Sequence, residues 1–193
     1  LLRHGQLPLW NPYNGAGAPL LANYQSALLY PLNWLGMGLP LVWSMSVTAV
    51  LHLFIAGLGM WQFTGRLGLP ELGRGVSTLA FGMSSYLVAR LGTYPTLFVA
   101  AWMPWILWSA LGILTQARRR DIGFLAIFAA MQLLAGHAQT TWYSMLLVVA
   151  FSAWWSVTHR PVQWRQWLLL AVGMSLAGGM AAAQLLSTAE LLS

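Results

Sequence analysis

The feature that most limits how this chain can fold is the run from Leu41 to Phe63, which holds no Asp, Glu, Lys or Arg. A helix rises about 1.5 Å per residue, and about 20 apolar residues cross a hydrocarbon core of about 30 Å. The run is therefore long enough to span a membrane. Other apolar stretches follow it, separated by turns rich in Gly, Pro and Arg. We predict spans at residues 41–63, 76–91, 95–116, 122–135, 140–157 and 167–186.

The composition supports a membrane protein. Charged residues make up only 6% of the chain, against about 25% in soluble proteins. The mean hydropathy is +0.66, and the 12 tryptophans suit anchoring at membrane interfaces. The predicted fold class is all-α, a polytopic transmembrane helical bundle. Residues 1–38 are expected to form a long extracytoplasmic N-terminal loop, and residues 39–193 a helical region of about six spans.

The arginines predict the orientation of these spans. The net charge is +6, which is also typical of nucleic-acid binding. Most of the arginines, however, fall in alternate turns between spans, so the positive-inside rule explains them and no nucleic-acid partner is predicted. The turns expected on the cytoplasmic side carry Arg66, Arg74, Arg118, Arg119, Arg120, Arg160 and Arg165. Residues 1–38, 92–95, 136–139 and the tail after Leu186 then share the outer side, with Arg3 and Arg90.

The stretch from Pro8 to Pro31, PLWNPYNGAGAPLLANYQSALLYP, is polar and rich in Pro and Gly, which resist helix and sheet. Its Asn and Gln amides can bond hydroxyl groups, and its aromatic rings can stack on the apolar face of a sugar. The alternative is an interfacial loop whose Trp and Tyr side chains lie at lipid headgroups. The residues alone leave both interpretations open.

This stretch also resembles the first extracytoplasmic loop of YfhO-type bacterial membrane proteins, which belong to the GT-C superfamily of glycosyltransferases. GHAQTTWY at 136–143 and AAAQLLSTAELLS at 181–193 are similar to two later motifs of that family, in the same order. Ala138 departs from the family pattern, which has Pro there. The resemblance implies an enzyme of the cell membrane. It would transfer a sugar from a polyprenyl phosphate to an extracytoplasmic cell-envelope polymer, so these two molecules and membrane lipid are the expected partners.

The resemblance further implies a catalytic Asp in the first outer loop, ahead of PLWNPY. Residues 1–30 contain no Asp or Glu. Since Leu1 is not a natural start, we expect a fragment of a longer protein whose catalytic Asp lies upstream. Glu190 is a weaker catalytic candidate within the chain. The alternative function is a non-catalytic transporter or lipid-binding scaffold.

The expected substrate-binding residues are polar or aromatic and lie on the outer side. They are Trp10, Asn11, Tyr13, Asn14, Asn23, Gln25, Arg90, His137, Gln139, Thr140, Tyr143, Gln184 and Glu190. Arg90 either neutralises a lipid phosphate or snorkels to the interface. His137 either caps a helix or contacts phosphate. We predict a concave pocket with one wall at residues 10–14, another at 137–143, and Glu190 nearby.

The remaining ionisable residues suggest structural roles. His52 lies within a predicted span, where a neutral ring bonded to a Ser or Thr is expected. Glu71 and Asp121 lie among arginines and are expected to be solvated. The chain has no cysteine and no Cys/His metal-ligand spacing, so no metal site or cofactor is predicted, although a divalent cation stays open. No nucleotide-binding motif appears.

Overall fold

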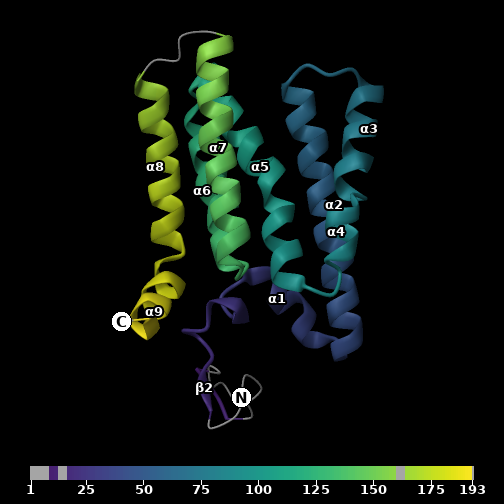
Figure 1. Ribbon diagram of the computed structural model, residues 1–193, viewed down its shortest axis with the longest axis vertical. Helices are drawn as coiled ribbons and strands as arrows, with labels where there is room; N and C mark the ends of the chain where they lie inside the picture. Colours follow the sequence, from purple (N-terminus) through teal and green to yellow (C-terminus); the bar gives the residue numbers. More distant parts are fainter. Residues whose placement is uncertain (1–8, 13–16, 160–163, 193) are drawn as a thin grey trace.

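The computed structural model describes residues 9–12, 17–159 and 164–192 (Figure 1). It is 81% helical with almost no strand, which confirms the all-α prediction. The strands β1 (Trp10–Asn11) and β2 (Ala18–Pro19) form a small antiparallel hairpin in which Trp10 pairs with Pro19. The hairpin projects from one end of the helical bundle (Figure 1).

Long helices make up the bundle, and shorter ones lie at its ends and between them. The long helices are α2 (Leu41–Arg66), α5 (Tyr94–Gln116), α6 (Arg119–Leu134), α7 (Ala138–Thr158) and α8 (Trp164–Met180). The shorter elements are η2 (Tyr24–Ser26), α1 (Pro31–Leu35), η3 (Gly36–Gly38), α3 (Glu71–Gly82), α4 (Ser85–Ala89) and α9 (Ala182–Leu192).

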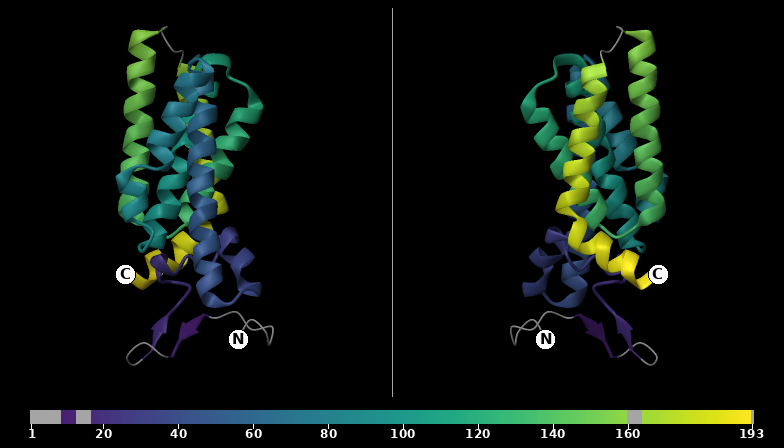
Figure 2. Two further views of the ribbon diagram at one scale, coloured as in Figure 1. Left: turned by 90° about the vertical axis from the view of Figure 1, so that its right-hand side faces the viewer. Right: turned by 90° about the vertical axis from the view of Figure 1, so that its left-hand side faces the viewer.

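Helix α5 forms the centre of the bundle. It packs against α2, α6 and α7, as Figure 2 also shows from the sides. Its most apolar window is 78% buried, whereas that of α2 is only 28% buried although α2 is equally hydrophobic. An uninterrupted apolar sequence suits a helix surrounded by other helices, and an apolar face without protein neighbours suits lipid. Helix α2 therefore leaves much of its surface for the membrane.

Among the described residues, two helices are long and apolar enough to cross a membrane, α2 and α5. The pair α8 and α9 is bent by 69° at its break, and it counts as a third candidate if the two helices form one broken span. The predicted span 167–186 is therefore interrupted at Ala181, and the expected tail belongs to helix α9. Gly178 and Gly179 precede the break, and glycine is a weak helix former. The predicted span 76–91 is likewise split into α3 and α4, since the Ser84 hydroxyl caps α4 by accepting from the Leu87 amide.

The turns between helices divide the bundle into two ends, named here as they appear in Figure 1. The upper end holds residues 67–70 and 117–118. The lower end holds residues 17–40, the turn at 90–93, the turn at 135–137 and helix α9. Within residues 1–38, the described part consists of the hairpin and short helices, not the long loop that we predicted.

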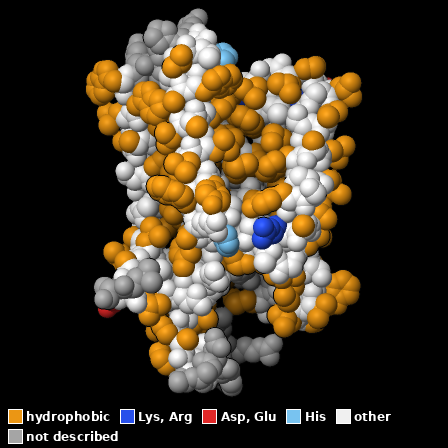
Figure 3. All heavy atoms as spheres, in the orientation of Figure 1, with side chains coloured by type: hydrophobic (Ala, Val, Ile, Leu, Met, Phe, Trp, Pro, Cys, Tyr) orange, Lys and Arg blue, Asp and Glu red, His pale blue; other side chains and the backbone are white. Residues whose placement is uncertain are grey.

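The arginines follow this division. Those at the upper end are Arg66, Arg74, Arg118, Arg119, Arg120 and Arg165, and Arg90 is the arginine that the described residues place at the lower end. Figure 3 shows a face covered mainly by hydrophobic side chains. Arg3 and Arg160 lie outside the described residues.

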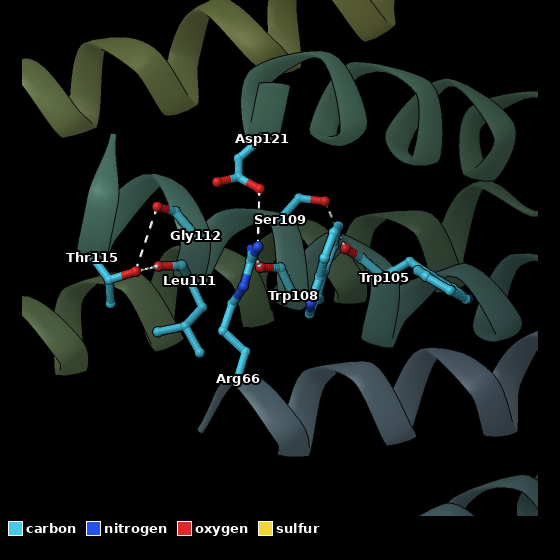
Figure 4. A network of polar contacts seen from close by, with 8 residues as sticks. All are labelled: Arg66, Trp105, Trp108, Ser109, Leu111, Gly112, Thr115 and Asp121. Carbon is cyan, nitrogen blue, oxygen red and sulfur yellow. Dashed lines mark hydrogen bonds and ion pairs between the residues drawn. The ribbon is translucent and has the colours of Figure 1, made fainter. Parts of the chain in front are cut away.

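A buried ion pair at the upper end corrects one prediction. Arg66 Nη2 lies 3.1 Å from Asp121 Oδ1, and the Asp121 side chain is 0% exposed rather than solvated (Figure 4). Arg66 also donates through Nη1 to the Trp108 carbonyl at 2.6 Å, and its guanidinium lies 4.0 Å from the centre of the Trp108 ring. The pair joins α2 to α6 across α5. A buried carboxylate is tolerated there because it is paired. Glu71, by contrast, is exposed, as predicted.

Candidate functional site

The segment from residue 20 to residue 38, which we call the covering segment, lies folded onto the helix ends at the lower end. The Tyr24 hydroxyl donates to the Leu133 carbonyl at 2.6 Å, and Gln184 Nε2 donates to the Leu21 carbonyl at 2.7 Å. Gly136 has a φ of +85°, and a Cβ there would lie 2.7 Å from the Tyr24 carbonyl oxygen. Burial raises the pKa of the Tyr24 phenol. Contacts from α6, the 135–137 turn and α9 therefore hold this segment in place.

Tyr30 fastens the same segment to the bundle interior. Its hydroxyl lies 2.6 Å from His52 Nε2 and accepts from Trp102 Nε1 at 2.8 Å. His52 Nδ1 lies 2.6 Å from the Thr48 carbonyl, which can only accept. Nδ1 therefore carries the hydrogen, and Nε2 accepts from the Tyr30 hydroxyl. With a neutral imidazole, every polar group in this series of hydrogen bonds has a partner. The neutral ring was expected, but its partners are Tyr30 and a backbone carbonyl rather than a Ser or Thr side chain.

The predicted residues of α7 line a groove that opens between α4, α5 and α7. It has a volume of about 210 Å³, and its lining includes Tyr86, Leu87, Ala100, Met103, Thr140 and Tyr143. Phe81, Ser144 and Leu147 complete it. Most of this surface is apolar, and the hydroxyls of Thr140, Ser144 and the two tyrosines supply its polar atoms. We call this cavity the lateral groove.

Arg90 and His137 lie at the ends of the helices that flank the lateral groove. Arg90 is the C-cap of α4, is exposed, and holds its guanidinium 5.4 Å from the centre of the Tyr86 ring. His137 is the N-cap of α7, and its Nδ1 accepts from the Thr140 amide at 3.2 Å. The cap that we weighed for His137 is thus confirmed. Because Nδ1 is an acceptor, a neutral ring carries its hydrogen on Nε2, which can donate to an anionic oxygen.

Gln139 and Tyr143 form a pair on the exposed side of α7. Gln139 Nε2 donates to the Tyr143 hydroxyl oxygen at 2.9 Å. The phenol hydrogen of Tyr143 is then available to a ligand in the lateral groove. The spacing of four residues along a helix brings the two side chains together, as the sequence predicted. Arg90, His137, Gln139, Thr140 and Tyr143 are therefore the predicted residues that gather around this groove.

The other predicted residues lie elsewhere. Trp10 is exposed in the projecting hairpin, where it covers Gly17, and Asn11 lies beside it in β1. The pocket that we predicted between residues 10–14 and 137–143 is not formed by Trp10 and Asn11, since neither lines the lateral groove. Tyr13 and Asn14 lie outside the described residues.

The predicted amides have structural contacts. The Asn23 side chain caps η2 by accepting from the Gln25 amide at 3.1 Å. Gln184 is 1% exposed and joins α9 to the Leu21 carbonyl. Gln25 lines a second cavity, described below. Glu190 is exposed on α9, which packs against η2.

Tyr86 and Leu87 are lining residues that the sequence analysis missed. Tyr86 precedes Arg90 by four residues, so a helical assignment of 85–90 alone would have placed the ring under the guanidinium. Within the described part of the chain, no three His, Cys, Asp or Glu residues are placed to hold a metal ion. The lateral groove therefore offers hydroxyl groups beside an apolar wall, and the Arg90 guanidinium and the His137 imidazole lie at the ends of the flanking helices α4 and α7.

Comparison of the chain with protein-family models, with curated proteins and with solved structures finds no match. The chemistry of the lateral groove and of the lower end is therefore the basis for assigning a function.

Proposed function

We propose that the chain is a multi-pass membrane protein that binds a polyprenyl-phosphate sugar in the lateral groove. It would be part of a GT-C-type glycosyltransferase that transfers the sugar to an extracytoplasmic cell-envelope polymer. The observation that carries the proposal is one groove with an apolar wall and a few hydroxyl groups, beside helix ends that carry Arg90 and His137. Leu87, Met103 and Ala100 suit an isoprenoid chain, and Thr140 and Tyr143 suit the polar head.

Arg90 and His137 support a phosphate at the lower end of the groove. A guanidinium forms strong, charge-assisted hydrogen bonds with phosphate oxygens, and the neutral His137 ring can add a donor through Nε2. Arg90 is also the arginine that the described residues place at this end, so an anion there has few competing cations. An anionic headgroup at the membrane interface would meet these donors while its tail stays among apolar side chains.

The distribution of arginines supports an extracytoplasmic lower end. Arg-rich turns between spans are retained on the cytoplasmic side, and such turns belong to the upper end. This orientation places the lateral groove, residues 17–40 and α9 on the side where cell-envelope polymers are built.

Glycosyl transfer at the lower end needs a carboxylate to accept a proton or stabilise positive charge. Glu71 and Asp121 belong to the upper end, and Asp121 is occupied by Arg66. Glu190 is the carboxylate that the described residues supply at the lower end. If the reaction uses it, Glu190→Gln should abolish sugar transfer while leaving donor binding unchanged.

A transporter or lipid-binding scaffold is the second candidate. Broken helices are typical of transporters, and here the chain breaks between α3 and α4 and again at the 69° bend between α8 and α9. Both candidates use the lateral groove. They differ in turnover, because only the enzyme moves the sugar to an acceptor.

The test is binding of radiolabelled undecaprenyl phosphate to the purified chain in lipid nanodiscs. Arg90→Gln should weaken binding by roughly tenfold or more, since a lost charged hydrogen bond is worth about 1.5–3 kcal/mol. Arg90→Lys should keep part of the affinity, because it retains charge without the planar fork. Arg74→Gln is the matched control, since Arg74 also lies over an aromatic ring, 4.1 Å from the centre of Trp61, but at the upper end.

Equal affinities in the Arg90 and Arg74 variants would refute the proposed phosphate site. Transfer of labelled sugar from the lipid to added cell-envelope polymer would decide between the enzyme and the scaffold. Unlabelled polyprenol, which lacks the phosphate, should compete weakly and with no dependence on Arg90.

A further inference from the structure

A second cavity of about 250 Å³ opens at the lower end and is lined by residues of three separate segments. They are Gln25, Ser26 and Asn33 before α2, Ser44 and Thr48 in α2, and Tyr94 in α5. We call this cavity the polar cavity. Of its residues, only Gln25 was singled out by the sequence.

The polar cavity is distinct from the lateral groove. On α5 it uses Tyr94, Pro95 and Phe98, whereas the groove uses Ala100 and Met103. At about 100° of rotation per residue, these two sets lie on opposite faces of the helix. A ligand in one cavity therefore does not occupy the other, and α5 separates them.

The lining of the polar cavity is hydrogen-bonding but uncharged. Hydroxyls come from Ser26, Ser44, Thr48 and Tyr94, and amides from Gln25 and Asn33. Asn33 donates through Nδ2 to the Ala27 carbonyl at 3.0 Å, which turns its Oδ1 into the remaining acceptor. The Ser26 hydroxyl is buried and has no hydrogen-bond partner among the described residues.

The apolar part of the cavity is rigid. Phe98 stacks on the His52 ring with centroids 3.8 Å apart and on Tyr30 at 5.8 Å. Those two rings are themselves fixed by the hydrogen-bonded chain that ends at Trp102. A side chain that is already held in place costs less to order when a ligand binds. Phe98 lines the same cavity as the hydroxyls and amides.

We infer that the polar cavity binds a neutral, hydroxyl-rich ring of the size of one sugar residue, either free or carried on a membrane lipid. Hydroxyl and amide groups match the hydroxyls of such a ring, and Phe98 and Tyr94 match its apolar face. An anion or a cation finds no opposite charge in this lining. Drug-sized ligands fill roughly 300–1,000 Å³, so this cavity suits a smaller molecule. The inference goes beyond the proposed function, since it requires neither the lateral groove nor a phosphate.

The test uses the purified chain in nanodiscs with two kinds of probe. The free probes are the methyl glycosides of glucose, galactose and mannose, detected by saturation-transfer NMR. The lipid probe is monoglucosyl diacylglycerol, detected as a rise in melting temperature. The variant is Ser44→Ala combined with Thr48→Val, which removes two hydroxyls and keeps the volume nearly unchanged. Ser46→Ala is the control, since Ser46 lies on the same helix but is exposed, with its hydroxyl bonded to the Val42 carbonyl.

Binding of at least one neutral probe, weakened in the double variant and unchanged in Ser46→Ala, supports the inference. Each lost hydrogen bond should weaken binding by roughly two- to tenfold. Binding of the free glycosides identifies a soluble sugar, and binding of the glycolipid alone identifies a lipid headgroup. No binding of any probe, or equal binding by the double variant, overturns the inference.

Arg90→Gln separates this result from the proposed function. Loss of glycoside binding in Arg90→Gln with full binding in the double variant would place the ring in the lateral groove and overturn the inference. Loss of undecaprenyl phosphate binding only in Arg90→Gln would leave the two cavities independent. If undecaprenyl phosphate binding is insensitive to Arg90 while glycoside binding depends on Ser44 and Thr48, the proposed phosphate site fails and the inference stands.

Discussion

The Tyr30 hydroxyl lies 2.6 Å from His52 Nε2, although Tyr30 belongs to the covering segment, residues 20–38, and His52 to the middle of α2. Both side chains are 0% exposed. One hydroxyl thus donates to the imidazole and accepts from Trp102, so it satisfies two buried nitrogens at once. This single phenol joins the covering segment, α2 and α5.

Tyr30→Phe should destabilise the folded protein by about 1–3 kcal/mol, because it leaves His52 Nε2 and the Trp102 indole N–H without a partner in a buried site. The measurement is thermal or denaturant unfolding in nanodiscs, followed by circular dichroism. Tyr86→Phe is the control, since Tyr86 is 48% exposed. A melting temperature of Tyr30→Phe equal to that of Tyr86→Phe would show that the chain of hydrogen bonds contributes little.

Alkaline pH should weaken the fold through the two buried phenols of the covering segment. Burial raises the pKa of Tyr24 and of Tyr30 above the ordinary value of 10.0. Below pH 10 both phenols are protonated in the folded and unfolded states, so their full stabilisation is present. As the pH rises above 10, the unfolded phenols ionise and the folded ones do not, so the free energy of unfolding falls by at most about 1.4 kcal/mol per group and pH unit.

The comparison is the free energy of unfolding at pH 9 and pH 11 for the wild type and for Tyr24→Phe with Tyr30→Phe. The double variant should lose less stability between the two values. An identical decrease in both proteins would assign the alkaline sensitivity to other groups.

Gly112→Ala should disrupt the upper end. A Cβ at Gly112 would collide with Arg66 Nη1 and would lie 2.6 Å from Asp121 Oδ2. Overpacking of this kind costs about 1–3 kcal/mol, here at the point where a buried charge pair must keep its geometry. Gly123→Ala, in α6, is the matched control because a Cβ there meets nothing within 4 Å. It should be neutral or stabilising, since Ala favours helix over Gly by about 1 kcal/mol. Similar effects of the two substitutions on the melting temperature would contradict the proposed steric conflict.

Cysteine labelling can test the orientation, because the chain has no cysteine of its own. A membrane-impermeant maleimide applied to intact cells should modify Gln139→Cys, at the lower end, and spare Arg119→Cys, at the upper end. Both sites become reactive after the cells are opened. The reverse pattern in intact cells would place the lateral groove and the polar cavity on the cytoplasmic side and would exclude the proposed acceptor.

The sequence predicted those helices that are determined by the length and hydropathy of their own segment. The run that became α5 was recognised within one residue at its start, because length and hydropathy alone determine such a helix. Helix α6 was likewise found, although its first turn with Asp121 was taken for a solvated turn. The partner of Asp121 is Arg66, 55 residues earlier, and no local sequence pattern predicts a contact between residues so far apart.

The candidate site was predicted only in part. The spacing of Gln139, Thr140 and Tyr143 gave their common position on α7, and the turn positions of Arg90 and His137 placed them at the same end. The separation of Trp10 from the 137–143 turn depends on how the hairpin leaves the covering segment, which has no periodic signal. The polar cavity was missed because Ser44, Thr48 and Tyr94 come from helices that the sequence treats as lipid-facing or buried spans.

The bond between Gln184 and Leu21 joins residues 163 positions apart. During synthesis, the covering segment leaves the ribosome long before α9 does, so this bond becomes possible later than the bonds of Tyr24 and Tyr30. Before then, Tyr24, Tyr30 and the 135–137 turn contribute to holding the segment over the helix ends. Contacts of such long sequence separation form slowly because the entropy of closing the loop must be overcome first. The growing chain therefore passes through a stage in which Tyr24 and Tyr30 already hold the covering segment while its bond to α9 is still to be made.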